Sequence, residues 1–177
     1  DPGGNVPEIL DFLRRRGLKV AQVVLTHGHI DHIAALEALL AAHPAPVRLH
    51  HADAAWAFTP RNRLPPYDTV PARPSALLDV EDGGEIAVAG LTARVLHTPG
   101  HSPGGVCLHF EREELLLSGD TLFAGSIGRT DLPGGDYHTL ISSIKTKLLP
   151  LGDDVKVLPG HGPATTLGNE RKFNPFL

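Results

Sequence analysis

The chain has 177 residues, enough for one domain with a substantial core, and its apolar and charged fractions of 41% and 20% are ordinary for a globular protein. A net charge of −4 gives no basic surface for nucleic acid, and no apolar run is long enough to cross a bilayer. The single cysteine, Cys107, excludes an intrachain disulfide and a cysteine-based zinc site.

The first half of the chain is predicted to alternate helices and strands. Pro7 opens a helix that Gly17 ends, and the valine-rich run 20–25 predicts a buried strand. Apolar residues at helical spacing after residue 32 predict a second helix that stops before Pro44, and a short strand is expected at 47–50. The proline-rich segment 58–74 has little periodicity, so we expect a long surface loop there.

The second half is predicted to contain mainly strands, at 85–88, 91–98, 105–110, 115–118 and 155–158. Ala89 and Gly90 separate the first two strands and predict a hairpin turn. The spacing of apolar residues predicts an amphipathic helix over 137–149. Strands therefore mix with helices along the whole chain.

The segment His27-Gly28-His29-Ile30-Asp31-His32 places three imidazoles and one carboxylate within six residues, directly after a predicted buried strand. Imidazole and carboxylate ligands together suit zinc, iron or manganese. We expect Gly28 to let the backbone turn so that the neighbouring side chains converge. A lone histidine would indicate only an exposed turn, but four donors in this arrangement favour a metal site.

Three further candidates follow predicted strands: His101 comes after 91–98, Asp120 after 115–118 and His161 after 155–158. Each one alone would be interpreted as an ordinary turn or cap residue. Loops at strand ends are where a rigid scaffold positions chemical groups, so their occurrence together favours one site.

In this order, the four segments resemble the metallo-β-lactamase superfamily, whose pattern is His-x-His-x-Asp-His, a Pro-Gly-His turn, a bridging aspartate and a final histidine. The resemblance covers nearly the whole chain and implies an α/β fold, the αββα sandwich, in a single domain over residues 1–177. The family has strands before its Asp-Pro-Gly turn, and this chain starts at Asp1-Pro2-Gly3. We therefore expect the domain to lack its first N-terminal strands.

The resemblance also implies two divalent metal ions, with zinc expected and iron or manganese as alternatives. One ion is assigned to His27, His29 and His101, the other to Asp31, His32 and His161, and Asp120 bridges them. A hydroxide shared by the two ions then attacks a carbonyl carbon. Asp31 and Asp120 are the expected catalytic residues, because Asp31 orients the nucleophile or takes a proton while Asp120 holds both ions.

Two distinctive stretches, residues 122–131 and the tail 169–177, resemble the short bacterial proteins related to glyoxalase II (hydroxyacylglutathione hydrolase). That branch implies hydrolysis of a small-molecule thioester such as S-lactoylglutathione, in the cytoplasm, with no membrane or nucleic-acid partner. Longer glyoxalase II enzymes carry a C-terminal helical domain that contacts glutathione, and we expect this chain, whose sequence ends at Leu177, to lack it. Glutathione specificity is thus left open, and β-lactam hydrolysis is expected to be low.

Arg129 and Tyr137 are weaker candidates for substrate binding. The alternative for Arg129 is an ion pair with Asp131 or Asp136, and the alternative for Tyr137 is packing in the core or a loop. Cys107 lies in an apolar strand and is expected in the core.

Two other functions compete with a binuclear hydrolase. One is a persulfide dioxygenase, a relative that resembles this chain in its Gly-Arg-Thr-Asp stretch but uses a single iron. The segment Pro159-Gly160-His161-Gly162 favours the glyoxalase type over it. The other is a metal-binding protein on the same fold that has no catalytic activity.

Overall fold

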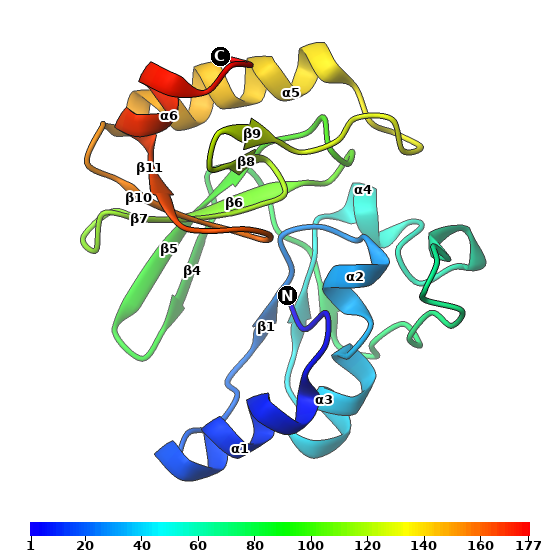
Figure 1. The fold of residues 1–177 in the computed structure, drawn as a ribbon. Coiled ribbons are helices and arrows are strands. Elements are labelled where there is room, and N and C mark those ends of the chain that lie inside the picture. Colours follow the sequence, from blue (N-terminus) through cyan, green and yellow to red (C-terminus); the bar gives the residue numbers. More distant parts are fainter. The chain divides into compact units, whose positions relative to one another are not determined.

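The computed structural model describes residues 1–177, which divide into two compact units, Asp1–Asp79 and Val80–Leu177 (Figure 1). Each unit combines a β-sheet with helices, which confirms the predicted mixture of strands and helices. None of the helices combines the length and the apolar character that a bilayer crossing requires.

The first unit contains a small parallel sheet in the order β1-β2-β3. Its strands are β1 (Val23–Val24), β2 (Val47–Arg48) and β3 (Leu77–Leu78). Its helices are α1 (Val6–Arg16), α2 (Ile30–Ile33), α3 (Leu36–Ala42), α4 (His51–Ala54) and the 3-10 turn η1 (Pro60–Asn62). Buried side chains of the strands, α2 and α3 form one core, and the half-buried face of α1 packs against it.

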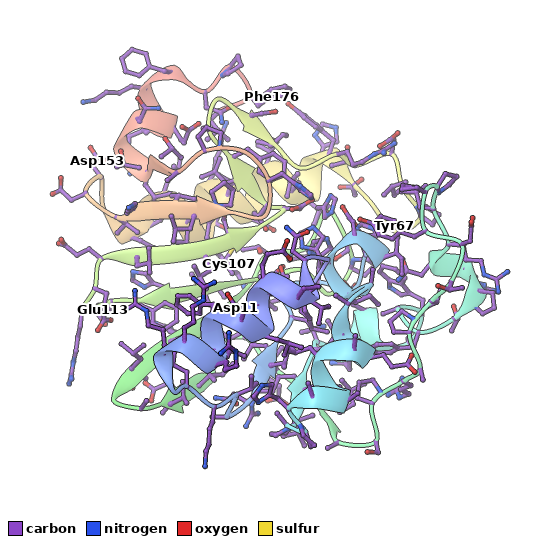
Figure 2. All side chains as sticks on the ribbon, turned by 60° about the horizontal axis from the view of Figure 1, so that its bottom comes forward. Asp11, Tyr67, Cys107, Glu113, Asp153 and Phe176 are labelled. Atoms are coloured by element: carbon purple, nitrogen blue, oxygen red, sulfur yellow. The ribbon has the colours of Figure 1, made fainter.

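Helix α1 follows its sequence signals closely. Pro7 lies in its first turn, and Gly17 ends it in a left-handed conformation, with its N–H donating to carbonyls of the last turn. Asp11 on this helix pairs with Arg14 at 2.6 Å and Arg15 at 2.7 Å (Figure 2). These pairs are exposed and add little to stability, so the half-buried apolar face holds the helix in place.

The predicted strands of the first unit are longer than those in the structure. Only Val23 and Val24 of the strand predicted at 20–25 pair with β2. The strand predicted at 47–50 ends early because His50 caps α4. The predicted second helix divides into α2 and α3 because the Ala35 N–H donates to the Pro2 carbonyl at 2.9 Å. The loop predicted at 58–74 is confirmed apart from η1 and one isolated bridge.

The second unit contains a six-stranded sheet in the order β11-β10-β7-β6-β5-β4. Its strands are β4 (Glu85–Val88), β5 (Leu91–His97), β6 (Val106–Phe110), β7 (Leu115–Gly119), β10 (Lys156–Pro159) and β11 (Thr165–Thr166). Only β10 and β7 pair in parallel, and the other neighbours are antiparallel. The predicted hairpin is confirmed, with Ala89 and Gly90 both at positive φ.

Helices cover one face of this sheet (Figure 1). They are α5 (Tyr137–Ser143), which continues as a π-helical segment (Ile144–Leu148) and a 3-10 turn (Leu149–Leu151), and α6 (Leu167–Phe173). The helix predicted over 137–149 is therefore real but irregular. Cys107 in β6 is completely buried in this core, as predicted, and burial raises the pKa of its thiol to about 11 (Figure 2).

The sequence did not predict β11, α6, or the hairpin of β8 (Leu122–Phe123) and β9 (Ser126–Ile127). Strands of two residues carry no readable alternation, and α6 presents few apolar side chains. Buried polar contacts between α6 and the hairpin hold both elements, as described below.

Candidate metal centre

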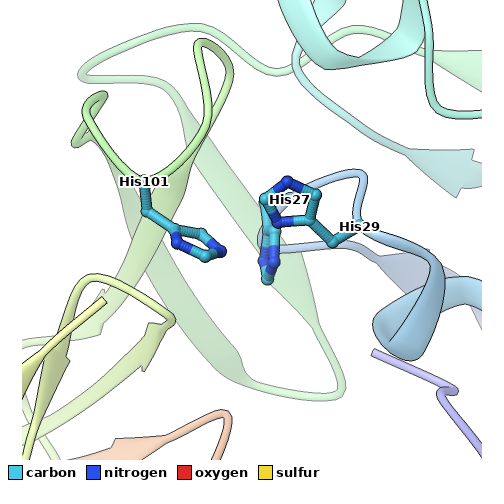
Figure 3. A group of neighbouring side chains, drawn as sticks. All are labelled: His27, His29 and His101. Carbon is cyan, nitrogen blue, oxygen red and sulfur yellow. The ribbon is translucent and has the colours of Figure 1, made fainter. Parts of the chain in front are cut away.

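The first group of predicted ligands lies on the loop between β1 and α2 and on α2 itself. His27 and His29 project from the loop, and their ring centroids are 4.9 Å apart (Figure 3). The ring of His32 lies 4.1 Å from that of His27, and both of these side chains are buried. Asp31 is half-buried, with Oδ2 at 3.8 Å from Nε2 of His32. The structure thus brings together four of the seven predicted ligands within the first unit.

Asp1 supports this group, a role that the sequence analysis did not predict. Its carboxylate accepts hydrogen bonds from the N–H of Thr26 at 2.7 Å and from its hydroxyl at 2.5 Å. It also lies 3.0 Å from Nδ1 of His32, which leaves Nε2 of that ring for a metal ion. The aspartate of the Asp-Pro-Gly turn was the available signal.

Gly28 is held from both sides by buried side chains. Its N–H donates to Asp53 at 2.8 Å, and its carbonyl accepts from Asn62 at 2.8 Å. A Cβ on Gly28 would lie 2.8 Å from the Cβ of Ala57. The expectation that Gly28 gives the backbone unusual freedom to turn is corrected. Glycine is required at this position because the backbone packs closely against Ala57. The sequence did not predict that Asp53 and Asn62 bind Gly28, because they lie 25 and 34 residues away from it along the chain.

The other three predicted ligands lie together in the second unit. His101 is on the turn after β5, Asp120 directly follows β7, and His161 follows β10. Oδ2 of Asp120 is 3.6 Å from Nε2 of His101 and 3.6 Å from Nε2 of His161. Asp120 and His101 are buried, whereas the side chain of His161 is 55% exposed.

These distances suit ligands that share a metal ion better than hydrogen-bonded partners. Two atoms bound tetrahedrally at about 2.0–2.2 Å from one ion lie about 3.3–3.6 Å apart. A hydrogen bond between an imidazole and a carboxylate would be about 2.7–3.2 Å long. Imidazole and carboxylate donors are also the set preferred by zinc, iron and manganese. Oδ2 of Asp120 therefore fits an atom that shares a metal ion with each of these two histidines.

The turn that carries His101 is anchored on two sides. Nδ1 of His101 lies 2.8 Å from the carbonyl of Arg129, so Nδ1 carries the proton and Nε2 is left for a metal ion. On the other side, the carbonyl of Gly100 accepts from the N–H of Asp136 at 2.8 Å. Gly100 has φ +129°, and a Cβ there would lie 2.3 Å from the backbone nitrogen of Leu140 in α5. Glycine is thus required for α5 to pack against this turn.

Comparison with known proteins decides the family. Residues 1–161 match the model of the metallo-beta-lactamase superfamily. The chain belongs to this superfamily.

Two curated relatives align with the whole of this chain, and each alignment covers 85% of the relative's own length. One is a probable metallo-hydrolase, YqgX, of Bacillus subtilis, with 41% identity. The other is the hydroxyacylglutathione hydrolase GloC of Haemophilus influenzae, with 35% identity.

Two solved structures are also similar. The B3 metallo-beta-lactamase BLEG-1 has a TM-score of 0.89 and 41% identity, over 99% of this chain and 86% of that one. TTHA1623 in a di-iron-bound form has a TM-score of 0.84 and 38% identity, over 100% of this chain and 87% of that one. The expected metallo-β-lactamase fold is thereby confirmed.

The structure bears differently on Arg129 and Tyr137, the two weaker candidates for substrate binding. Arg129 forms a two-pronged ion pair with Asp131, at 2.6 and 2.7 Å, which is the alternative stated for it. The hydrogen bond from Arg129 lowers the pKa of Asp131 to about 2. Tyr137 is 44% exposed at the start of α5, so packing in the core is wrong for it, and packing in a loop stays the alternative to substrate binding.

Proposed function

We propose that the protein is a hydrolase that uses two divalent metal ions to cleave a small-molecule thioester, with S-lactoylglutathione as the expected substrate. The observation that carries this proposal is the position of Asp120, whose Oδ2 lies 3.6 Å from Nε2 of both His101 and His161. Superfamily membership and 35% identity to a hydroxyacylglutathione hydrolase support the reaction class.

The proposal assigns seven ligands to the two ions. His27, His29 and His101 would hold one ion, Asp31, His32 and His161 would hold the other, and Asp120 would be shared. When bound, such ions lower the pKa of water to about 7 and polarise a carbonyl oxygen. Zinc is the expected metal, and the di-iron form of TTHA1623 makes iron the main alternative to test.

The chain's own residues favour a thioester over a substrate with a poorer leaving group. The Asp31 carboxylate is half-buried and reachable from solvent, which suits a group that accepts a proton and passes it on. No separate general acid is included in the proposed set. A thiolate leaves without strong acid assistance, so a thioester suits such a site.

Arg129 and Tyr137 are proposed as contacts for the substrate. Arg129 and Tyr137 are exposed and accessible to a substrate, although the guanidinium of Arg129 is already paired with Asp131. We propose a cytoplasmic location, as the resemblance to the short proteins related to glyoxalase II implies.

The test combines metal analysis with parallel assays on the purified protein. We expect close to two metal ions per chain and thiol release from S-lactoylglutathione. Two thioesters without glutathione test how far recognition depends on it. A β-lactam is included because BLEG-1 is 41% identical to this chain, and we expect slower hydrolysis of it than of the thioester. Oxygen uptake on glutathione persulfide with one bound iron, and no thiol release, would refute the hydrolase.

A further inference from the structure

The β8–β9 hairpin leads directly to the carbonyl that orients His101. After β9 the chain passes through Gly128 to Arg129, whose carbonyl lies 2.8 Å from Nδ1 of His101. A Cβ on Gly128 would lie 1.8 Å from the carbonyl oxygen of Asp120 and 3.1 Å from Nδ1 of His101. The path of residues 126–129 therefore sets the position of this histidine.

The hairpin cannot hold that path alone. β8 and β9 have two residues each and form a separate two-stranded sheet. An isolated pair of strands is marginally stable at best in water, even when it is longer than this one. Leu122 and Ile127 bury their side chains in the core of this unit, which leaves the exposed tip at Gly125 to be held by another element.

Helix α6 supplies that support through Glu170, which is fully buried. Oε2 of Glu170 accepts from the Gly125 N–H at the tip of the hairpin, at 2.8 Å, and from Nδ2 of Asn174 at 2.8 Å. Oε1 accepts from the hydroxyl of Thr165 at 2.6 Å and from Nδ2 of Asn169 at 3.0 Å. Burial acts to raise the pKa of Glu170, but these four hydrogen bonds outweigh it and keep its pKa below the ordinary value.

Asn174 completes the contact between the tail and the hairpin. Its Nδ2 donates to the carbonyl of Ser126 at 3.0 Å as well as to Glu170, and the residue is buried. The Glu170 carboxylate thus binds the N–H of Gly125, and the Asn174 amide binds the carbonyl of the next hairpin residue, Ser126. Hydrogen bonds to a buried carboxylate are stronger than those between neutral groups.

We propose that Glu170 and Asn174 are positioning residues for the metal ligand His101, acting through the β8–β9 hairpin and the Arg129 carbonyl. The inference rests on the proposed function in one respect, namely that His101 binds a metal ion. The two distinctive stretches of the sequence, 122–131 and 169–177, thus contact each other through the hydrogen bonds of Glu170 and Asn174 to the hairpin.

The test compares Asn174→Ala with Asn169→Ala. Each variant removes one amide donor from Glu170, but only Asn174 also contacts the hairpin. Metal affinity is measured by competition with a chelating indicator. We expect a loss of about 10–100-fold for Asn174→Ala, as is typical when support of a ligand is removed, and less than threefold for Asn169→Ala.

A second readout follows the ring N–H of His101 by ¹⁵N NMR in metal-free protein. It should exchange slowly with water in the wild type and in Asn169→Ala, and rapidly in Asn174→Ala. Should Asn174→Ala fail to fold, Glu170→Gln takes its place with the same expectation. Unchanged ring exchange and metal affinity in the tested variant would overturn the inference. The ring measurement needs neither metal nor substrate, so failure of the proposed function would be seen separately, in wild-type protein without metal or turnover.

Discussion

Removing the side chain of Asn62 tests how the His27–His29 loop is held. Asn62 is 5% exposed, and its Nδ2 donates to the carbonyls of Gly28 at 2.8 Å and Ala57 at 2.7 Å. A net hydrogen bond contributes about 0.5–1.5 kcal/mol, and a buried acceptor left without a partner costs about 1–3 kcal/mol. Because water can enter the space left by Asn62→Ala and partly replace both bonds, we expect a loss of about 2–4 kcal/mol in the free energy of unfolding.

The measurement is urea unfolding of the metal-free protein, followed by circular dichroism, so that metal binding does not mask the effect. Arg61→Ala is the matched control, since Arg61 lies in the same 3-10 turn and is exposed. Metal affinity should also fall in Asn62→Ala, because Gly28 lies between two predicted ligands. A loss below 0.5 kcal/mol, equal to that of Arg61→Ala, would refute the reasoning that these bonds hold the loop.

Three further outcomes are expected. Asp120→Ala should abolish turnover and lower metal content. His138→Ala should do neither, because His138 is an exposed histidine outside the predicted ligand set. Equal activity of the two variants would remove the bridging role of Asp120. The carboxyl of Asp131 should titrate near pH 2 by NMR and shift towards 3.8 in Arg129→Ala. Because the pair is exposed, its contribution to stability is small; it is present above about pH 3.8 and is lost as the pH falls through 2. An unchanged titration would contradict the ion pair. Cys107 should resist a thiol reagent at pH 8 in folded protein and react in urea, because it is buried with a pKa of about 11; rapid labelling of folded protein would contradict this burial.

Local signals along the sequence determined the elements whose stabilising contacts are themselves local. Helix α1 has Pro7 in its first turn and Gly17 at its end, and the β4–β5 hairpin has Ala89 and Gly90 at its turn. In each case the decisive conformational preference belongs to residues inside the element. The ligand pattern was readable for a similar reason, because four donors lie within the six residues from His27 to His32.

Tertiary structure decided everything that depends on partners far along the chain. Asp1 reaches His32, Asp53 reaches Gly28, and Glu170 reaches Gly125 across 45 residues. The spacing of residues along the sequence does not indicate which two residues form such a pair. Because contacts of this kind hold α6 and the β8–β9 hairpin, these elements were not predicted. The types of the metal ligands can thus be read from the sequence, whereas the buried hydrogen bonds that orient them exist only once the chain has folded and excluded water from those groups.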